Sequence, residues 1–97
     1  MKLEFAESWL QDLANESPGK TRFSKAVVRA YRTKLDLIVA ARNERDLRSI
    51  RGLRFKELKG MDGLYSVRVN DQFRIVFRIR HEVSGNVIQV QDLTDYH

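Results

Sequence analysis

Three residues whose side chains can move or orient protons, Asp95, Tyr96 and His97, come shortly after a run typical of a strand, residues 87–91. A carboxylate and an imidazole can serve as general acid or base, and imidazole titrates near neutral pH. Arginines on the strands upstream would lie beside them. Because phosphodiester cleavage needs proton transfer and stabilisation of negative charge, this combination suits chemistry on a phosphodiester.

The segment from Gly63 to Ile79 predicts a hairpin with arginines on one face, because successive strand side chains point to opposite sides. Seven apolar residues should pack against helices: Tyr65, Val67, Val69, Phe73, Ile75, Phe77 and Ile79. Arg68, Arg74 and Arg78 should share the open face, where like charges repel. RNA phosphates or a partner's carboxylates would compensate. A solvated face, with arginines paired to local acids, stays open.

The composition favours a protein that binds nucleic acid over a metal-binding protein or a membrane protein. The 97 residues predict one domain, residues 1–97, with a net charge of +5. There is no cysteine, and the two histidines are far apart in sequence, which argues against a disulfide framework and a zinc site. No run approaches the roughly 18 apolar residues of a membrane-spanning helix, and no apolar signal core follows Met1. We expect a cytoplasmic protein.

The elements predict an α+β fold with two N-terminal helices packed on a small antiparallel β-sheet. Residues 2–6 fit either an edge strand or the start of the first helix, which should cover residues 7–15. Ser24 is the expected N-cap of a longer helix that ends near Asn43. One more helical turn is expected at residues 46–50, followed by strands over residues 53–58, 65–69, 73–80 and 87–95.

A basic residue recurs at every third position from residue 42 to residue 54: Arg42, Arg45, Arg48, Arg51 and Arg54. On a helix the first three would form a stripe that could follow a phosphate backbone. Charges that only keep the surface solvated, interleaved with Glu44 and Asp46, explain the spacing equally well. The pattern alone leaves both interpretations open.

Three segments resemble the HigB toxins of the bacterial RelE/ParE toxin–antitoxin superfamily. They are Leu58-Lys59-Gly60, the run Ser-Val-Arg-Val-Asn-Asp-Gln-Phe-Arg at residues 66–74, and Asp95-Tyr96-His97, and the resemblance covers about residues 20–97. It implies a RelE-like fold and a ribosome-dependent endoribonuclease that cuts mRNA in the ribosomal A site. The implied chemistry is attack by the ribose 2′-hydroxyl, with neither a metal nor another cofactor.

The resemblance also implies roles for individual residues. Lys59 and Arg74 would stabilise phosphate charge, Asp95 and His97 would transfer protons, and Tyr96 would orient or stack the RNA. Further RNA contacts are expected from Arg51, Arg54, Lys56, Arg68 and Arg78. Some HigB proteins have a histidine where this chain has Lys56; because lysine is a poor base at neutral pH, we expect Lys56 to contact phosphate.

The implied partners are an antitoxin similar to HigA with a helix-turn-helix domain, the ribosome and mRNA. DNA would be bound only indirectly, through the toxin–antitoxin complex. Two other functions stay open: a toxin similar to ParE that poisons DNA gyrase, and a basic RNA-binding module without catalysis. The segment Asp95-Tyr96-His97 together with Lys59 favours the nuclease, because a gyrase poison has no need of proton-transfer groups.

Overall fold

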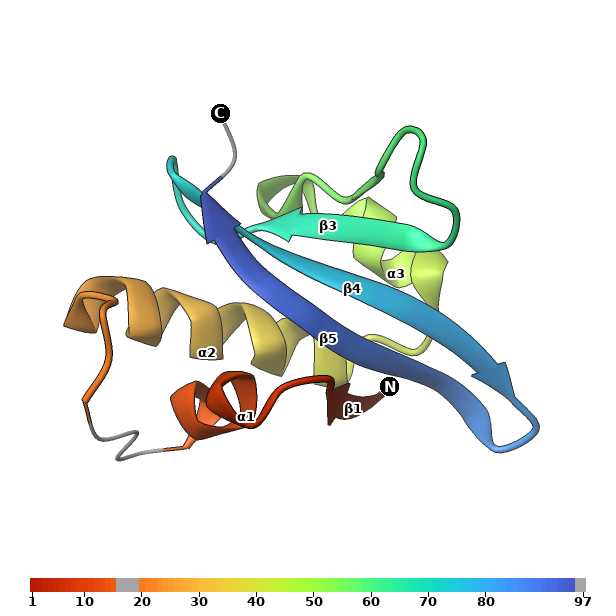
Figure 1. Cartoon of the computed structure of the whole chain (residues 1–97). Coiled ribbons are helices and arrows are strands. Elements are labelled where there is room, and N and C mark those ends of the chain that lie inside the picture. The colour runs from red at the N-terminus through yellow and green to blue at the C-terminus, as the bar shows by residue number, and fades with distance from the viewer. Residues whose placement is uncertain (16–19, 96–97) are drawn as a thin grey trace.

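The computed structural model describes residues 1–15 and 20–95 and contains a five-stranded sheet with the strand order β1-β5-β4-β3-β2 (Figure 1). The strands are β1 (Lys2–Phe5), β2 (Lys56–Glu57), β3 (Leu64–Arg68), β4 (Phe73–Glu82) and β5 (Gly85–Asp95). Neighbouring strands are antiparallel, except that β1 runs parallel to β5. The expected α+β fold is confirmed, with the correction that the sheet is mixed. Residues 2–5 form its edge strand.

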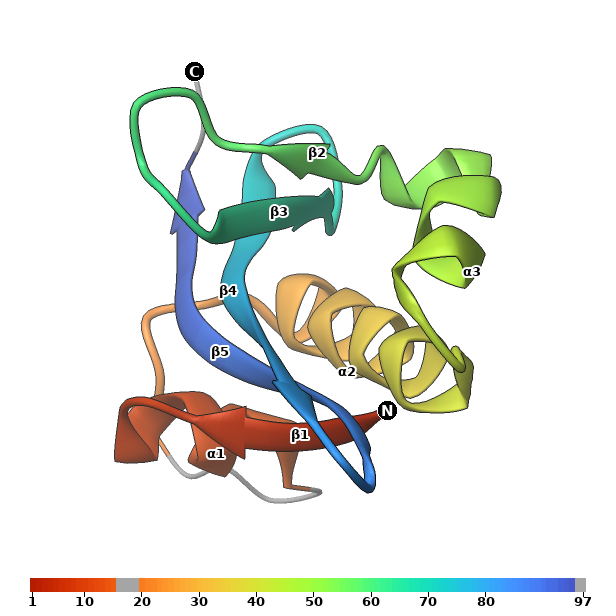
Figure 2. The ribbon, with the colours of Figure 1, turned by 90° about the vertical axis from the view of Figure 1, so that its right-hand side faces the viewer.

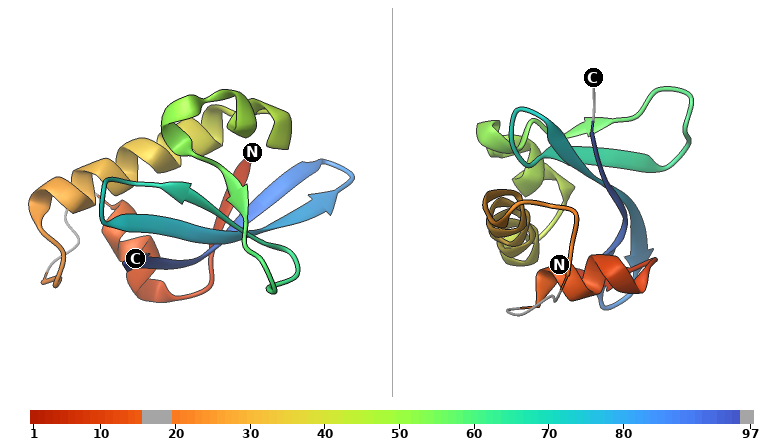
Figure 3. Two further views of the ribbon diagram at one scale, coloured as in Figure 1. Left: turned by 90° about the horizontal axis from the view of Figure 1, so that it is seen from above. Right: turned by 60° about the vertical axis from the view of Figure 1, so that its left-hand side comes forward.

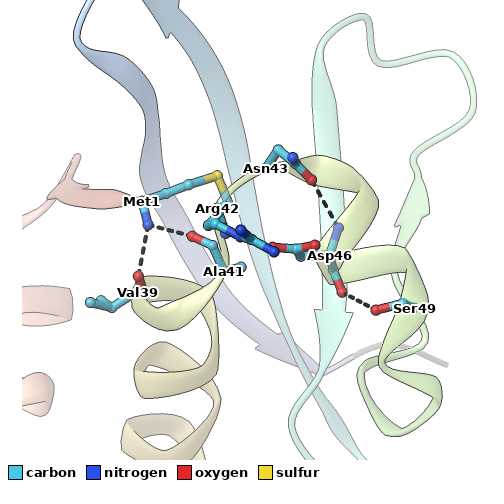
Figure 4. Close-up of polar contacts among 7 residues, drawn as sticks. All are labelled: Met1, Val39, Ala41, Arg42, Asn43, Asp46 and Ser49. Carbon is cyan, nitrogen blue, oxygen red and sulfur yellow. Dashed lines mark hydrogen bonds and ion pairs between the residues drawn. The ribbon is translucent and has the colours of Figure 1, made fainter.

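The helices are α1 (Ser8–Ala14), α2 (Lys25–Ala40) and α3 (Glu44–Ser49), followed by the 3-10 turn η1 (Arg51–Leu53). Ser24 caps α2 as predicted, since its hydroxyl accepts a hydrogen bond from the Val27 amide at 3.2 Å. Asn43 does not end α2 but begins α3, where its side chain accepts from the Asp46 amide at 3.1 Å (Figure 4). The strand expected over residues 53–58 is reduced to β2 because η1 occupies its start.

Helices α1 and α2 lie on one side of the sheet, and the hydrophobic core lies between these helices and the sheet (Figures 1 and 2). The predicted alternation is confirmed, because Val67, Ile75 and Phe77 are fully buried in this core. The Tyr31 hydroxyl donates to the Leu10 carbonyl at 2.8 Å and so joins α2 to α1. Burial raises the pKa of Tyr31, because the interior disfavours the phenolate.

Strand β1 is attached at its start and at its middle. The Met1 amino group donates to the Val39 and Ala41 carbonyls, each at 2.7 Å, at the end of α2 (Figure 4). Glu4 forms an ion pair with Arg80 of β4. Because β5 lies between β1 and β4, this ion pair spans β5. Among the described residues, no helix is both long enough and apolar enough to cross a membrane.

The Glu4–Arg80 pair predicts a pH-dependent attachment of β1. Its hydrogen bond from Arg80 holds the pKa of Glu4 below the ordinary value of 4.5. The pair therefore stabilises the fold at pH values above 4.5. This stabilisation is lost as the pH falls through the lower pKa that Glu4 has in the folded protein. We expect Glu4→Gln to melt below the wild type at neutral pH and the two melting temperatures to converge in acid. A difference that persists at low pH would contradict this assignment.

Candidate functional site

The sheet face opposite α2 holds a groove of about 580 Å³. It lies between the loop joining β2 to β3 and the end of β5, and its lining residues are Leu58, Met61, Leu64, Val76, Gln91, Asp92, Thr94 and Asp95. Leu58 and Val76 are buried, at 7% and 8% exposure, yet neither belongs to the core cluster beneath the helices. The groove therefore has its own apolar floor.

Lys59 lies exposed on the loop that forms one wall of this groove. The loop is closed by backbone hydrogen bonds, from the Leu58 amide to the Leu64 carbonyl at 2.9 Å and from the Met61 amide to the Leu58 carbonyl at 3.3 Å. Gly60 follows Lys59 with a φ of 74°, a conformation that glycine adopts without strain. In the sequence Leu58-Lys59-Gly60, the buried leucine therefore anchors the loop, the lysine is an exposed cation, and the glycine makes the turn.

Arg78 stabilises this loop from the sheet. It lies opposite Leu64 in the β3–β4 register, and its Nη1 donates to the Asp62 carbonyl at 3.1 Å. Figures 2 and 3 show the loop projecting from the sheet on the side away from α2. Arg78, one of the expected RNA contacts, therefore also has a structural contact that positions the loop carrying Lys59.

Arg74 is half-buried and oriented by two neutral acceptors. Its Nε donates to the Ser66 hydroxyl at 2.9 Å, and its Nη2 donates to the Arg54 carbonyl at 2.6 Å. Ser66 is fully buried, so this hydroxyl is fixed in place. Arg74 also pairs in register with Thr94, which lines the groove. The guanidinium is therefore held in a defined orientation over β3, on the same face of the sheet as the groove.

Arg54 contributes its carbonyl to this arrangement from a strained backbone. Its φ of 45° makes it the one non-glycine residue with positive φ in the described part of the chain. Left-handed backbone costs an L-residue about 1–2 kcal/mol, and such strain tends to occur at functional sites. The strained residue directs its main-chain oxygen at Arg74.

This geometry predicts different stabilities for two substitutions of Arg54. Arg54→Gly removes the side chain and relieves the strain, whereas Arg54→Ala removes the side chain and keeps the strain. We expect the glycine variant to be more stable than the alanine variant by roughly 1 kcal/mol in urea unfolding. Both variants keep the carbonyl that Arg74 needs, so equal stability would show that the left-handed conformation is not strained.

Asp95 ends β5 and contributes to the groove wall. Its Oδ2 accepts a hydrogen bond from the Gln72 side chain at 3.0 Å, and it is the register partner of Phe73. Tyr96 and His97 lie outside the described residues. Of the expected catalytic residues, Asp95 lines the groove itself, Lys59 follows the lining residue Leu58, and Arg74 is the register partner of the lining residue Thr94. The predicted site residues Tyr96 and His97 follow Asp95 directly in sequence.

The other expected RNA contacts fall into two groups. Arg68 lies directly opposite Arg74, and Lys56 lies opposite Ser66, so both belong to the open face beside the groove. Arg68 also forms an ion pair with Asp71 in the β3–β4 turn, so local pairing accounts for part of its charge. Arg51 is exposed in η1, and no described contact of its side chain links it to the groove.

The stripe of arginines before η1 is largely paired within its own segment. Arg42 lies 3.7 Å from Asp46, and Arg48 lies 2.8 Å from Glu44. The Arg48 guanidinium also lies 4.7 Å from the centre of the Phe55 ring. These contacts favour the solvated interpretation for Arg42 and Arg48 over a row of phosphate contacts.

Sequence reasoning missed two features of the site. Ser66 was seen only as a polar residue in the alternation, although its burial makes it the support of Arg74. Gln91 and Asp92 were seen as ordinary strand residues, although both line the groove. The only signal for Ser66 was its place on the same face as Arg68 and Arg74. Val76 of β4 pairs with Asp92, but Phe77 pairs with Val90, so Gln91 is an extra residue in β5. No residue near position 91 signals this bulge in the sequence.

Comparison with known proteins agrees with this fold and with the earlier resemblance. Residues 3–97 match the family model described as the RelE-like toxin of the type II toxin–antitoxin system HigB. The chain is 35% identical to Toxin HigB-1 of Vibrio cholerae serotype O1 over 79 residues, which cover 80% of this chain and 83% of that toxin. It also superposes on a YoeB/ParE toxin from Agrobacterium tumefaciens with a TM-score of 0.60 and 23% identity, over 100% of both chains.

The last of these matches concerns the fold alone, because its sequence identity is low. The family model and the Vibrio cholerae toxin both match most of the chain in sequence. The chain therefore belongs to the HigB family of RelE-like toxins of type II toxin–antitoxin systems, a membership that implies an antitoxin as its partner.

Proposed function

We propose that this toxin is a ribosome-dependent endoribonuclease that cuts mRNA in the A site and thereby inhibits translation. The observation that supports the proposal is a groove on the open face of the sheet that Asp95 lines, with Lys59 next to the lining residue Leu58 and Arg74 paired in register with the lining residue Thr94. These residues come from two sheet strands and a loop that are far apart in sequence. A strand of RNA lying along the groove would meet cations and a carboxylate together.

The reaction assigned to this site begins with the ribose 2′-hydroxyl of the bound codon. As its proton is removed, the 2′ oxygen attacks the adjacent phosphorus in line, the O2′–P bond forms, and the P–O5′ bond breaks. The products are a 2′,3′-cyclic phosphate and a 5′-hydroxyl, which forms when the departing 5′ oxygen takes up a proton. Asp95 and His97 would exchange these two protons, and Tyr96 would hold or stack the RNA.

The cations act on the charge that develops at phosphorus. Arg74 would donate to the equatorial phosphate oxygens, and its two neutral acceptors keep it preorganised, so no reorientation is needed during the reaction. Lys59 would approach the same phosphate from the loop above. Lys56 and Arg68 would bind neighbouring phosphates, and these contacts should weaken as salt is added.

The antitoxin in this proposal carries a helix-turn-helix domain and holds the toxin inactive. The complex, rather than the toxin alone, would bind operator DNA. This assignment follows from the family. In addition, the net charge of +5 makes an acidic surface of the antitoxin a favourable partner.

The proposal is tested by inducing the toxin in growing cells and mapping the 5′ ends of transcripts, with and without a block of translation initiation. We expect breaks at fixed positions within codons that disappear when translation is blocked. Purified toxin should give the same breaks on ribosomes programmed with a defined message. Intact transcripts combined with altered plasmid supercoiling would instead identify a gyrase poison, and binding to ribosomes without breaks would identify a non-catalytic module.

A further inference from the structure

The β3–β4 turn is held in one conformation largely by the side chain of Asn70. Its Oδ1 accepts hydrogen bonds from the Gln72 amide at 2.9 Å and from the Phe73 amide at 2.7 Å. The Val69 and Asn70 amides both donate to the Phe73 carbonyl, at 2.9 Å and 3.3 Å. An asparagine side chain that binds the backbone two residues further on is a common way to build a tight turn. The backbone of Gln72 therefore has a defined position.

Gln72 reaches from this turn to the end of β5. Phe73 and Asp95 form the first pair in the register of β4 with β5, so the turn lies beside the end of β5 (Figure 1). The Gln72 Nε2 donates to the Asp95 Oδ2 at 3.0 Å, a contact between residues 23 positions apart. Because an ionised carboxylate only accepts hydrogen bonds, Gln72 must present its NH2 group to Asp95 rather than its carbonyl oxygen.

This contact orients a side chain more than it stabilises the fold. Gln72 and Asp95 are both exposed, so water competes for each partner and the net gain in stability is small. The ladder between β4 and β5 already joins the two segments. What the hydrogen bond restricts is the rotamer of a carboxylate at the end of a strand, which could otherwise turn away from the groove.

The orientation matters because Asp95 lines the groove and has a proton to transfer in the proposed reaction. A general acid or base must lie within hydrogen-bond reach of the atom that it serves, and a small misplacement costs a large part of the rate. Each carboxylate oxygen can accept more than one hydrogen bond, so the bond from Gln72 is compatible with a second bond to the substrate.

We propose that Gln72 is a positioning residue, whose amide holds the Asp95 carboxylate in the orientation in which it exchanges a proton with the RNA. The inference rests on the proposed function, because Asp95 has this role only if the toxin cleaves RNA. Gln72 acts through Asp95 and not on the substrate, and Asn70 contributes by fixing the position of Gln72. Asp71, between them, forms the ion pair with Arg68. The turn thus positions a carboxylate and a cation that the proposed site uses.

The first test is single-turnover cleavage on programmed ribosomes with saturating toxin. Gln72→Met keeps the length of the side chain and removes the donor, so we expect cleavage about ten-fold slower with ribosome affinity within about two-fold of the wild type. Its melting temperature should stay within about 4 °C of the wild type, as for other exposed substitutions. Gln11→Met makes the same change at an exposed position of α1 and should cleave at the wild-type rate.

A double-mutant cycle tests whether Gln72 acts through Asp95. Asp95→Ala should slow cleavage by about 10²–10⁴-fold, and adding Gln72→Met should slow it no further, because the group that Gln72 orients is gone. Asn70→Ala should also be slow in the wild-type background and without effect in the Asp95→Ala background. A Gln72→Met loss that persists in full without Asp95 would mean that Gln72 contacts RNA or supports another residue, and it would overturn the inference. Wild-type cleavage by Asp95→Ala would do the same.

An NMR measurement on the free toxin tests the contact without ribosomes. The signals of the Gln72 side-chain NH2 group should move when Asp95→Ala removes the acceptor, whereas those of Gln11 should not. Gln72 signals that stay in place would contradict the contact and with it the inference.

The two assays together separate this inference from the proposed nuclease function. If the wild-type toxin cleaves and Gln72→Met cleaves equally fast, the positioning role is wrong and the nuclease stands. If the wild-type toxin does not cleave on ribosomes at all, the nuclease is wrong, and the catalytic role of the contact is overturned with it even where the NMR signals show that the contact exists.

Discussion

Replacing His97 with alanine is expected to slow cleavage on programmed ribosomes by about 10²–10⁴-fold, the usual contribution of a positioned general acid or base. The same change should abolish growth arrest on induction. The reason is chemical, since imidazole is the one side chain of the proposed site that titrates near neutral pH without perturbation. The measurement is single-turnover cleavage with saturating toxin, which separates the chemical step from binding.

The other histidine supplies a matched control. His81 is exposed near the β4–β5 turn, where its Nδ1 lies 2.9 Å from the Asn86 side chain, and it does not line the groove. His81→Ala should cleave at the wild-type rate. Deletion of residues 95–97 should be as inactive as His97→Ala while the protein remains folded. A folded, truncated toxin that still arrests growth would remove these residues from the mechanism.

The parts of the fold predicted from the sequence are those encoded by local periodicity. The apolar stripe that begins at Val27 follows the 3.6-residue period of a helix, and the alternation from Tyr65 to Ile79 follows the two-residue period of a strand. The Ser24 cap follows from one side chain and the nearest backbone amides. In each case a few neighbouring residues determine the element, so distant contacts were not needed.

The parts that could not be predicted depend on contacts between distant residues. The parallel pairing of β1 with β5 joins residues more than 80 positions apart, and the segment 2–6 alone fits a strand or a helix equally well. The bulge at Gln91 has no glycine or proline to mark it, since it arises from the register of β4 against β5. Asn43 was assigned to the wrong helix because an Asn can end one helix or cap the next.

The candidate site shows the same division. Residue types and a resemblance proposed Lys59, Arg74 and Asp95 as site residues, and strand parity correctly put Arg68 and Arg74 on one face. What orients Arg74 was not visible, because the Arg54 carbonyl is a backbone group and carries no sequence signal. Ser66 looked like any polar strand residue until its complete burial was known.

Arg74→Ala is the second large effect we expect, a loss of about 10²–10³-fold in the cleavage step, equivalent to about 2.7–4 kcal/mol of transition-state stabilisation. The loss should appear in the rate at saturating toxin, because preorganised donors act where charge develops rather than on ground-state binding. The matched control is Arg45→Ala on α3, which removes the same charge from an exposed position outside the groove and should change only the salt-dependent affinity.

Two further variants separate the charge of Arg74 from its orientation. Arg74→Lys keeps the charge but cannot donate to both Ser66 and the Arg54 carbonyl as the guanidinium does, so its rate should stay near that of Arg74→Ala. Ser66→Ala keeps the guanidinium and removes one of its supports, so we expect an intermediate rate with unchanged ribosome affinity. If Arg74→Lys cleaves at the wild-type rate, a point charge is sufficient and the orienting contacts have no role in catalysis. If Arg74→Ala also cleaves normally, Arg74 is structural, and phosphate stabilisation would have to come from Lys59.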